Sequence, residues 1–248
     1  MKLTQVFWLA DYFFYLWRSN SRHGTHSPFV YQFADQILYQ KSEPIDIDIL
    51  ELWRSETMNF QLEKRKFHDL NPIFPQKKYL TLLFRQLNNI QVGSTFIEIG
   101  HSFWSIPRVI ESAKKDIQYF HYSDITFSNE VSYSESYESN LAELHKQNST
   151  QQLWDFLTGR PKIDFVFVNA MIIDLEPLIS IQLIDKIIDL LSDQGTIYLY
   201  GIDNNWNQKN LWDQMIRHPR VTAHIDLFRM GILFVRPEQR KEKFILRY

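Results

Sequence analysis

Apolar residues in the second half of the chain form short, nearly continuous runs that alternate with amphipathic segments. A continuous apolar run of this length is typical of a strand buried on both faces, whereas apolar residues at helical spacing predict a helix. The expected strands are Ser94–Gly100, Ile117–Ser123, Ile163–Asn169 and Thr196–Gly201, and the expected helices between them are Ile106–Lys115, Ser139–Lys146, Gln151–Leu157 and Asp174–Leu191. This alternation predicts an α/β fold with a parallel sheet covered on both faces.

The end of the chain has a different pattern. Two apolar runs, Val221–Phe228 and Gly231–Pro237, are joined by Arg229 and Met230, which predicts a hairpin and an antiparallel edge of the sheet. The following tail, Arg236–Arg247, mixes basic and acidic residues and is interpreted as a solvated face. No signature of a nucleic-acid-binding module is present, so we expect no nucleic acid partner.

The pattern in the first half of the chain predicts mainly helices. We expect one aromatic helix over Met1–Asn20, a second that starts at Pro28 with Ser27 as its N-cap, and a third over Lys77–Asn88. Lys41–Pro75 has little periodicity and is interpreted as an irregular connection. The expected division is a helical extension over residues 1–90 and an α/β domain over residues 91–248.

The amino-acid composition excludes several classes of function. The net charge of −2 favours neither nucleic acid nor an anionic surface over the whole chain, and the absence of cysteine excludes disulfides, thiolate catalysis and cysteine-ligated metals. With only seven glycines and no GxGxxG pattern, a glycine-rich phosphate loop is not expected.

The aromatic run Val6–Trp17 is too short to span a bilayer as a helix, and no cleavage site follows it. We therefore expect a cytoplasmic protein. The run is interpreted either as a helix packed on the core or as a helix that contacts a partner or a membrane surface.

The strand that ends at Glu98-Ile99-Gly100 begins like a cofactor site but continues with bulky residues. A tight turn of small residues normally follows such a strand, so that the backbone approaches the ligand. Here the turn contains His101, Ser102, Phe103 and Trp104, and the Trp104 indole has the size to fill a cofactor channel.

Three segments resemble a bacterial family of class I S-adenosylmethionine-dependent methyltransferases that is O-methyltransferase-like. They are RHGTHSPFVY at Arg22–Tyr31, the loop Glu98–Trp104, and the ending His218–Tyr248. The resemblance implies a Rossmann-like class I methyltransferase sheet with an antiparallel C-terminal hairpin. It also implies S-adenosylmethionine as cofactor and an oxygen or nitrogen atom as methyl acceptor.

The resemblance assigns candidate cofactor residues to Glu98, Gly100, Ser102, Asp124 and Asn169. Glu98 would hold the amino end of the cofactor, although a strand-end carboxylate also commonly pairs with a nearby base. Asp124 would accept hydrogen bonds from the ribose hydroxyls, although an Asp in this position also caps helices and turns.

Candidate residues at the methyl acceptor are Asp203 and His26. A carboxylate or an imidazole there could act as a base, whereas a histidine in a turn before a helix cap is often only structural. No metal is expected, because Asn169 and Asp203 together provide a single carboxylate.

The chain departs from the family pattern in three loops. Asn169-Ala170 stands where the family has Asp-Gly, Trp104 replaces a loop glycine, and one terminal acid near Asp203 is missing. Two functions therefore remain open, an active methyltransferase and an inactive methyltransferase fold kept as a binding or scaffold subunit.

Overall fold

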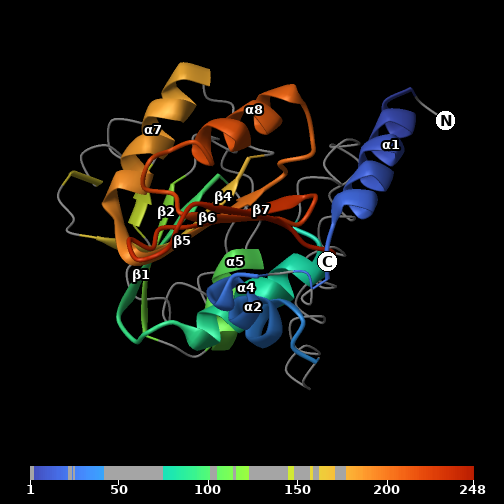
Figure 1. Cartoon of the computed structure of the whole chain (residues 1–248). Helices are drawn as coiled ribbons and strands as arrows, with labels where there is room; N and C mark the ends of the chain where they lie inside the picture. The colour runs from blue at the N-terminus through green and yellow to red at the C-terminus, as the bar shows by residue number, and fades with distance from the viewer. Residues whose placement is uncertain are drawn as a thin grey trace, which may run out of the picture.

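An eight-stranded sheet crosses the molecule and carries helices on both faces (Figure 1). The computed structural model describes residues 3–21, 24, 26–41, 75–100, 105–113, 116–122, 145–147, 157–158, 162–170 and 177–248. The helices are α1 (Leu3–Arg18), α2 (Pro28–Phe33), the π-helix η2 (Ala34–Leu38), α4 (Lys77–Asn89), α5 (Ser105–Ala113), α7 (Pro177–Leu190) and α8 (Trp206–Met215). The strands are β1 (Ser94–Ile99), β2 (Ile117–Tyr122), β3 (His145–Gln147), β4 (Ile163–Asn169), β5 (Leu191–Tyr200), β6 (Ala223–Asp226), β7 (Met230–Phe234) and β8 (Glu242–Ile245).

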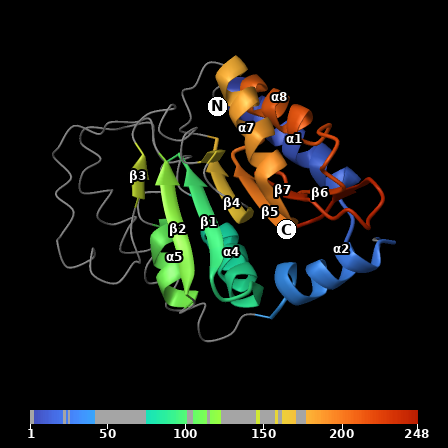
Figure 2. The ribbon, with the colours of Figure 1, turned by 90° about the vertical axis from the view of Figure 1, so that its left-hand side faces the viewer.

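The strands follow the order β3-β2-β1-β4-β5-β7-β6-β8, which Figure 2 shows across most of the sheet. Only β7 runs against the others, because it pairs antiparallel with both β5 and β6. The predicted α/β fold, a parallel sheet with an antiparallel C-terminal hairpin, is confirmed. The hairpin does not form the edge of the sheet, however, because β7 lies inside it and β8 adds to β6 in parallel.

Three details of the predicted elements were wrong. Residues 145–147 form a strand where the Ser139–Lys146 helix was expected to end, and the rest of that expected helix lies outside the described residues. The tail is not only a solvated face, because it contains β8 and the buried Leu246. Helix α8 was missed, although Asn205 is a clear N-cap whose side chain accepts hydrogen bonds from the backbone N–H groups of Asn207 and Gln208.

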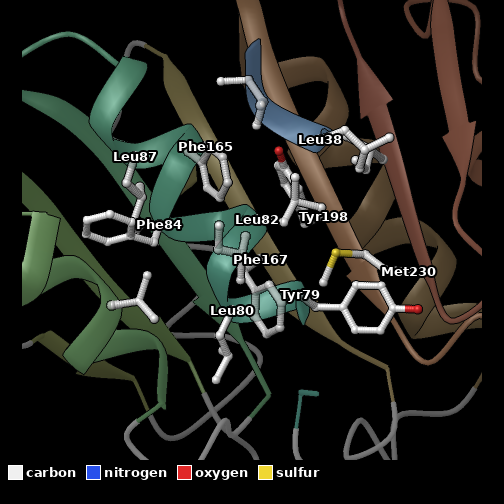
Figure 3. Packing of buried hydrophobic residues seen from close by; sticks show 14 of the residues in the cluster. Leu38, Tyr79, Leu80, Leu82, Phe84, Leu87, Phe165, Phe167, Tyr198 and Met230 are labelled. Atoms are coloured by element: carbon white, nitrogen blue, oxygen red, sulfur yellow. The ribbon is translucent and has the colours of Figure 1, made fainter. Parts of the chain in front are cut away.

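The two faces of the sheet have separate cores. Helices α2, η2, α4 and α5 cover one face and α7 and α8 the other (Figure 1). Along β4, Phe165 and Phe167 point to the first core, and Val166 and Val168 point to the second. In Figure 3 the phenylalanines of β4 and Tyr198 of β5 face the apolar side chains of α4.

A row of aromatic rings links the central strands within the first core. Phe165 stacks on Phe96 of β1 with ring centroids 4.8 Å apart and on Tyr198 of β5 with centroids 4.9 Å apart. Offset stacking adds to the apolar burial of such rings. The row therefore holds β1, β4 and β5 in one register.

Gly231 of β7 lies against the Trp212 indole of α8, in the second core. A Cβ atom at position 231 would lie 2.4 Å from Cζ3 of Trp212 and 2.6 Å from its Cη2. Because the indole is rigid and buried, neither group can move aside without a rearrangement of the core.

We expect Gly231→Ala to lower the free energy of unfolding by about 2 kcal/mol through overpacking. Urea denaturation measures the change. The matched control is the same substitution in a Trp212→Leu background, where the added methyl group has space and its cost falls to less than half. An equal cost in both backgrounds would contradict the contact with Trp212.

His224 is a buried histidine without hydrogen-bond partners. Its side chain is 5% exposed, neither ring nitrogen is bonded, and the ring packs edge-on against Trp212. Burial, together with the charges of Lys243 and Lys241, lowers the pKa of His224 to about 4. The folded protein therefore keeps this imidazole neutral down to acidic pH.

This histidine predicts a loss of stability on acidification. Because the unfolded pKa of histidine is about 6.5, the unfolded chain takes up the proton first as the pH falls. The wild type is expected to lose about 2 kcal/mol more than His224→Leu between pH 7.5 and pH 5. Chemical denaturation of both proteins at the two pH values measures this difference, and parallel losses would exclude His224 as the cause.

Candidate functional site

The carboxyl ends of β1, β4 and β5 meet at one edge of the sheet, where ligands of open α/β sheets bind. Gly100 follows β1 with φ +84°, and its N–H donates to the Tyr122 carbonyl at 2.9 Å. A Cβ atom at position 100 would lie 2.9 Å from the backbone oxygen of Asn169, at the end of β4. Glycine is therefore required by its backbone conformation and by the close approach of the two strand ends.

Glu98 lies two residues before this glycine, with its side chain buried on the α4 and α5 side of the sheet. The Tyr119 hydroxyl donates to Glu98 Oε2, and Oε1 is buried with no hydrogen-bond partner among the described residues. Burial and the nearby Glu98 carboxylate raise the pKa of Tyr119 well above its usual value, so this phenol stays a donor. The unused oxygen of Glu98 can accept a hydrogen bond from a ligand that reaches the end of β1.

Asn169 is fully buried at the end of β4, beside the start of α8. The next residue, Ala170, donates its N–H to the Tyr200 carbonyl at 3.0 Å and accepts a bond from the Gln208 side-chain amide at 2.9 Å. The Asn205 cap fixes the first turn of α8 and thus the position of Gln208. Gln208 Oε1 is buried without a partner, which leaves a second unused acceptor near this edge.

Two predicted cofactor residues, Ser102 and Asp124, lie outside the described residues, as do His101, Phe103 and Trp104. The structure therefore brings together Glu98, Gly100 and Asn169 and leaves the other two as predictions.

Asp203 follows β5 and forms a buried ion pair that the sequence did not predict. Its Oδ2 lies 3.3 Å from Arg229 Nη2 and accepts a hydrogen bond from Trp8 Nε1 of α1 at 2.9 Å. Its Oδ1 is buried, and no residue in the described ranges bonds it. Burial lowers the pKa of Arg229, but the Asp203 carboxylate and the Tyr200 side chain together raise it above its usual value, so the guanidinium stays charged. Asp203 thus joins the N-terminal helix, the hairpin turn and the end of β5.

His26, the other predicted acceptor-side residue, lies elsewhere. It is exposed and lines a surface pocket of about 650 Å³ with Trp17 and Arg18 of α1 and Lys243 and Phe244 of β8. Trp17 is nine residues from Trp8 along α1, about 13 Å in a helix. His26 and Asp203 therefore do not form one catalytic pair. The cap next to His26 has the predicted geometry, but the Ser27 hydroxyl accepts from Gln239 at 3.0 Å and does not bond the helix.

Arg229 is the residue that sequence reasoning missed most clearly. The sequence placed it in the hairpin turn, and a lone cation in a turn beside the end of a central strand was the available signal. No sequence pattern indicated the role of Trp8, because its hydrogen-bond partner, Asp203, is 195 residues away in the chain. Among the described residues, no group of three or more His, Asp or Glu side chains is placed to hold a metal ion.

Loss of the Asp203 charge is expected to cost much more than loss of an exposed carboxylate. The Asp203 side chain is 4% exposed, so Asp203→Asn leaves the Arg229 cation buried without its counter-charge and lowers the free energy of unfolding by about 3 kcal/mol. The control is Asp193→Asn, because the Asp193 side chain is 61% exposed and its pairs with Lys162 and Arg220 are worth under about 1 kcal/mol. Urea denaturation compares the two variants, and similar losses would contradict a structural ion pair at Asp203.

Comparison with known proteins adds information on the fold. No protein-family model matches the chain, and no curated protein matches it in sequence. Among solved structures it is similar to the methyltransferase PaMTH1 from Podospora anserina, bound to SAH, with 14% identity, a TM-score of 0.52, and coverage of 86% of this chain and 98% of that one. It also matches the O-methyltransferase TomG from Streptomyces achromogenes in complex with SAM, with 14% identity, a TM-score of 0.49, and coverage of 80% and 92%. The strand order and the likeness to PaMTH1 show that this chain has the Rossmann-like fold of class I S-adenosylmethionine-dependent methyltransferases.

Proposed function

We propose that the protein binds S-adenosylmethionine at the carboxyl ends of β1 and β4 and transfers its methyl group to an oxygen or nitrogen atom of an acceptor. The observation that carries the proposal is Gly100, whose left-handed backbone lies against the Asn169 carbonyl where a side chain cannot fit. Such a glycine lets the backbone of the first loop approach a ligand.

The described residues at this edge fit the donor. Glu98 Oε1 is a buried acceptor without a partner, which suits the ammonium group of the donor's amino acid portion. The sulfonium, when bound, supplies a methyl group that is already activated, so the work left to the chain is to hold and orient. Ser102 and Asp124, which follow β1 and β2 in the sequence, are proposed to complete the contacts.

Asp203 is the acceptor-side group that the structure favours. Its Oδ2 is engaged by Arg229 and Trp8, which fixes the carboxylate, and its Oδ1 remains as an acceptor for a hydroxyl or amine proton. His26 lines another pocket and is not given a role in this step.

A second function is supported by the same ion pair. Because Asp203 also ties α1 to the body, its carboxylate has a structural use that a chain without catalysis would keep. The alternative proposal is a donor-binding protein of this fold that serves as a binding or scaffold subunit. Conversion of S-adenosylmethionine to S-adenosylhomocysteine in the presence of a small-molecule cell extract favours the enzyme, and donor binding without conversion favours the alternative.

Calorimetric titration with S-adenosylhomocysteine tests the binding step. We expect binding at micromolar levels, a rise in Tm with ligand, and a loss of at least about tenfold in affinity in Gly100→Ala. The matched control is Gly93→Ala, because Gly93 has φ +79° and thus the same backbone strain, but its Cβ would meet no atom within 4 Å. We expect this control to keep its affinity within about twofold.

The absence of both binding heat and thermal stabilisation in the wild type at millimolar ligand would overturn the proposed function. Equal losses of affinity in Gly100→Ala and Gly93→Ala would show instead that backbone strain, not the approach to Asn169, controls the site.

A further inference from the structure

Helix α1 has one aromatic face that packs on the body of the protein. The rings of Trp8, Tyr12 and Tyr15 surround Phe228 of the β6–β7 turn, with centroids 5.4, 5.0 and 5.2 Å from it. The Tyr15 hydroxyl also donates to the Leu246 carbonyl, and Asp11 pairs with Lys209 of α8 at 2.6 Å. These contacts hold α1 on the body of the protein and do not involve the residues on its opposite face.

The opposite face of α1 carries large apolar side chains that nothing in the described structure covers. Phe13 is 67% exposed, Phe14 54% and Trp17 80%. Figure 1 shows α1 at the periphery of the molecule. Three exposed aromatic rings on one short helix are unusual on a soluble surface and indicate a binding face.

Cations border this face at the C-terminal end of α1. The Arg18 guanidinium lies 5.2 Å from the centroid of the Phe14 ring, and Arg18 and Lys243 line the pocket next to Trp17. Both are exposed, and although the partly buried Asp226 carboxylate interacts electrostatically with each of them, no described carboxylate lies within ion-pair distance of either. The pocket also contains Glu242, whose carboxylate accepts a hydrogen bond from Gln239 at 2.7 Å. Aromatic rings with neighbouring cations are suited to bind a surface that has an apolar interior and an anionic boundary.

We propose that the outer face of α1 docks on an anionic lipid surface, with Phe13, Phe14 and Trp17 in the headgroup region and Arg18 and Lys243 against lipid phosphates. Aromatic side chains favour this depth, and cations near the surface add attraction to anionic lipids. No helix in the described part of the chain has the length and apolar character to cross a membrane, so the contact is peripheral.

The exposed area favours lipid over a second copy of the chain. The three rings together expose roughly 400 Å², about half of the ~800 Å² that each partner buries in a standard protein interface. A lipid surface needs no complementary shape, so a few aromatic side chains are sufficient for reversible attachment.

Vesicle co-sedimentation of the full chain tests the proposal. We expect binding to phosphatidylcholine vesicles that contain about 30% phosphatidylglycerol, and weaker binding to phosphatidylcholine alone. The triple variant Phe13→Ser, Phe14→Ser, Trp17→Ser is expected to lose at least about tenfold in affinity. The pair Arg18→Gln, Lys243→Gln is expected to lose the preference for anionic vesicles and the sensitivity to salt.

The matched control is Trp206→Ser, because Trp206 is a 75% exposed tryptophan on α8, outside the proposed surface. Its vesicle binding is expected to equal that of the wild type. Unchanged Tm and unchanged S-adenosylhomocysteine affinity in all variants show that the fold and the donor site are intact, so failure here is distinct from failure of the proposed function. Absence of vesicle binding by the wild type, equal binding by the triple variant, or a dimer in sedimentation velocity that the triple variant abolishes would overturn the proposal.

Discussion

The stacked rings of Phe96, Phe165 and Tyr198 set the alignment on which the rest of the structure depends. They join β1, β4 and β5 at the centre of the sheet, where both faces are buried and a slip of one residue would exchange the two cores. With the strands held in this register, their carboxyl ends finish together, and Gly100 comes against Asn169 while Ala170 reaches Tyr200. The candidate site is thus a consequence of packing several residues away from it.

The same packing limits where polar groups can be placed. The central strands are apolar over most of their length, so the buried carboxylates of Glu98 and Asp203 occur only at or beyond strand ends. Each has one oxygen bonded by a side chain and one without a partner. A buried acceptor without a donor lowers the free energy of unfolding, and the packing around each carboxylate offsets this loss. Two such oxygens at one edge of the sheet add a chemical argument to the one from Gly100 for the proposed ligand site.

How far the sequence predicts this structure depends on the range of the interactions involved. Strands β1, β2 and β4 could be predicted because each is a nearly continuous apolar run that only a doubly covered strand explains. Strand β8 was missed because its residues, Glu242–Ile245, include two charges and gain strand character only by pairing with β6. The bond between Trp8 and Asp203 joins residues 195 positions apart, and no local pattern reports such a contact. Glu98 and Asn169 were identified, whereas Tyr119, which bonds Glu98, and Gln208, which bonds the residue after Asn169, required coordinates.

The two ends of the chain pack against each other, and this explains why α1 can have two aromatic faces. Asn20 pairs with Leu246, and Tyr39 and Lys78 bond the carbonyls of Arg247 and Tyr248. The backbone bonds of Asn20 with Ile245 and Arg247, together with the rings around Phe228, anchor the C-terminal end of α1 and the segment after it. A helix held so firmly by its inner face does not need Phe13, Phe14 or Trp17 for folding. The proposed contact with an anionic lipid surface gives these exposed rings a use, and it matches the positive charge of Arg18 and Lys243 beside Trp17.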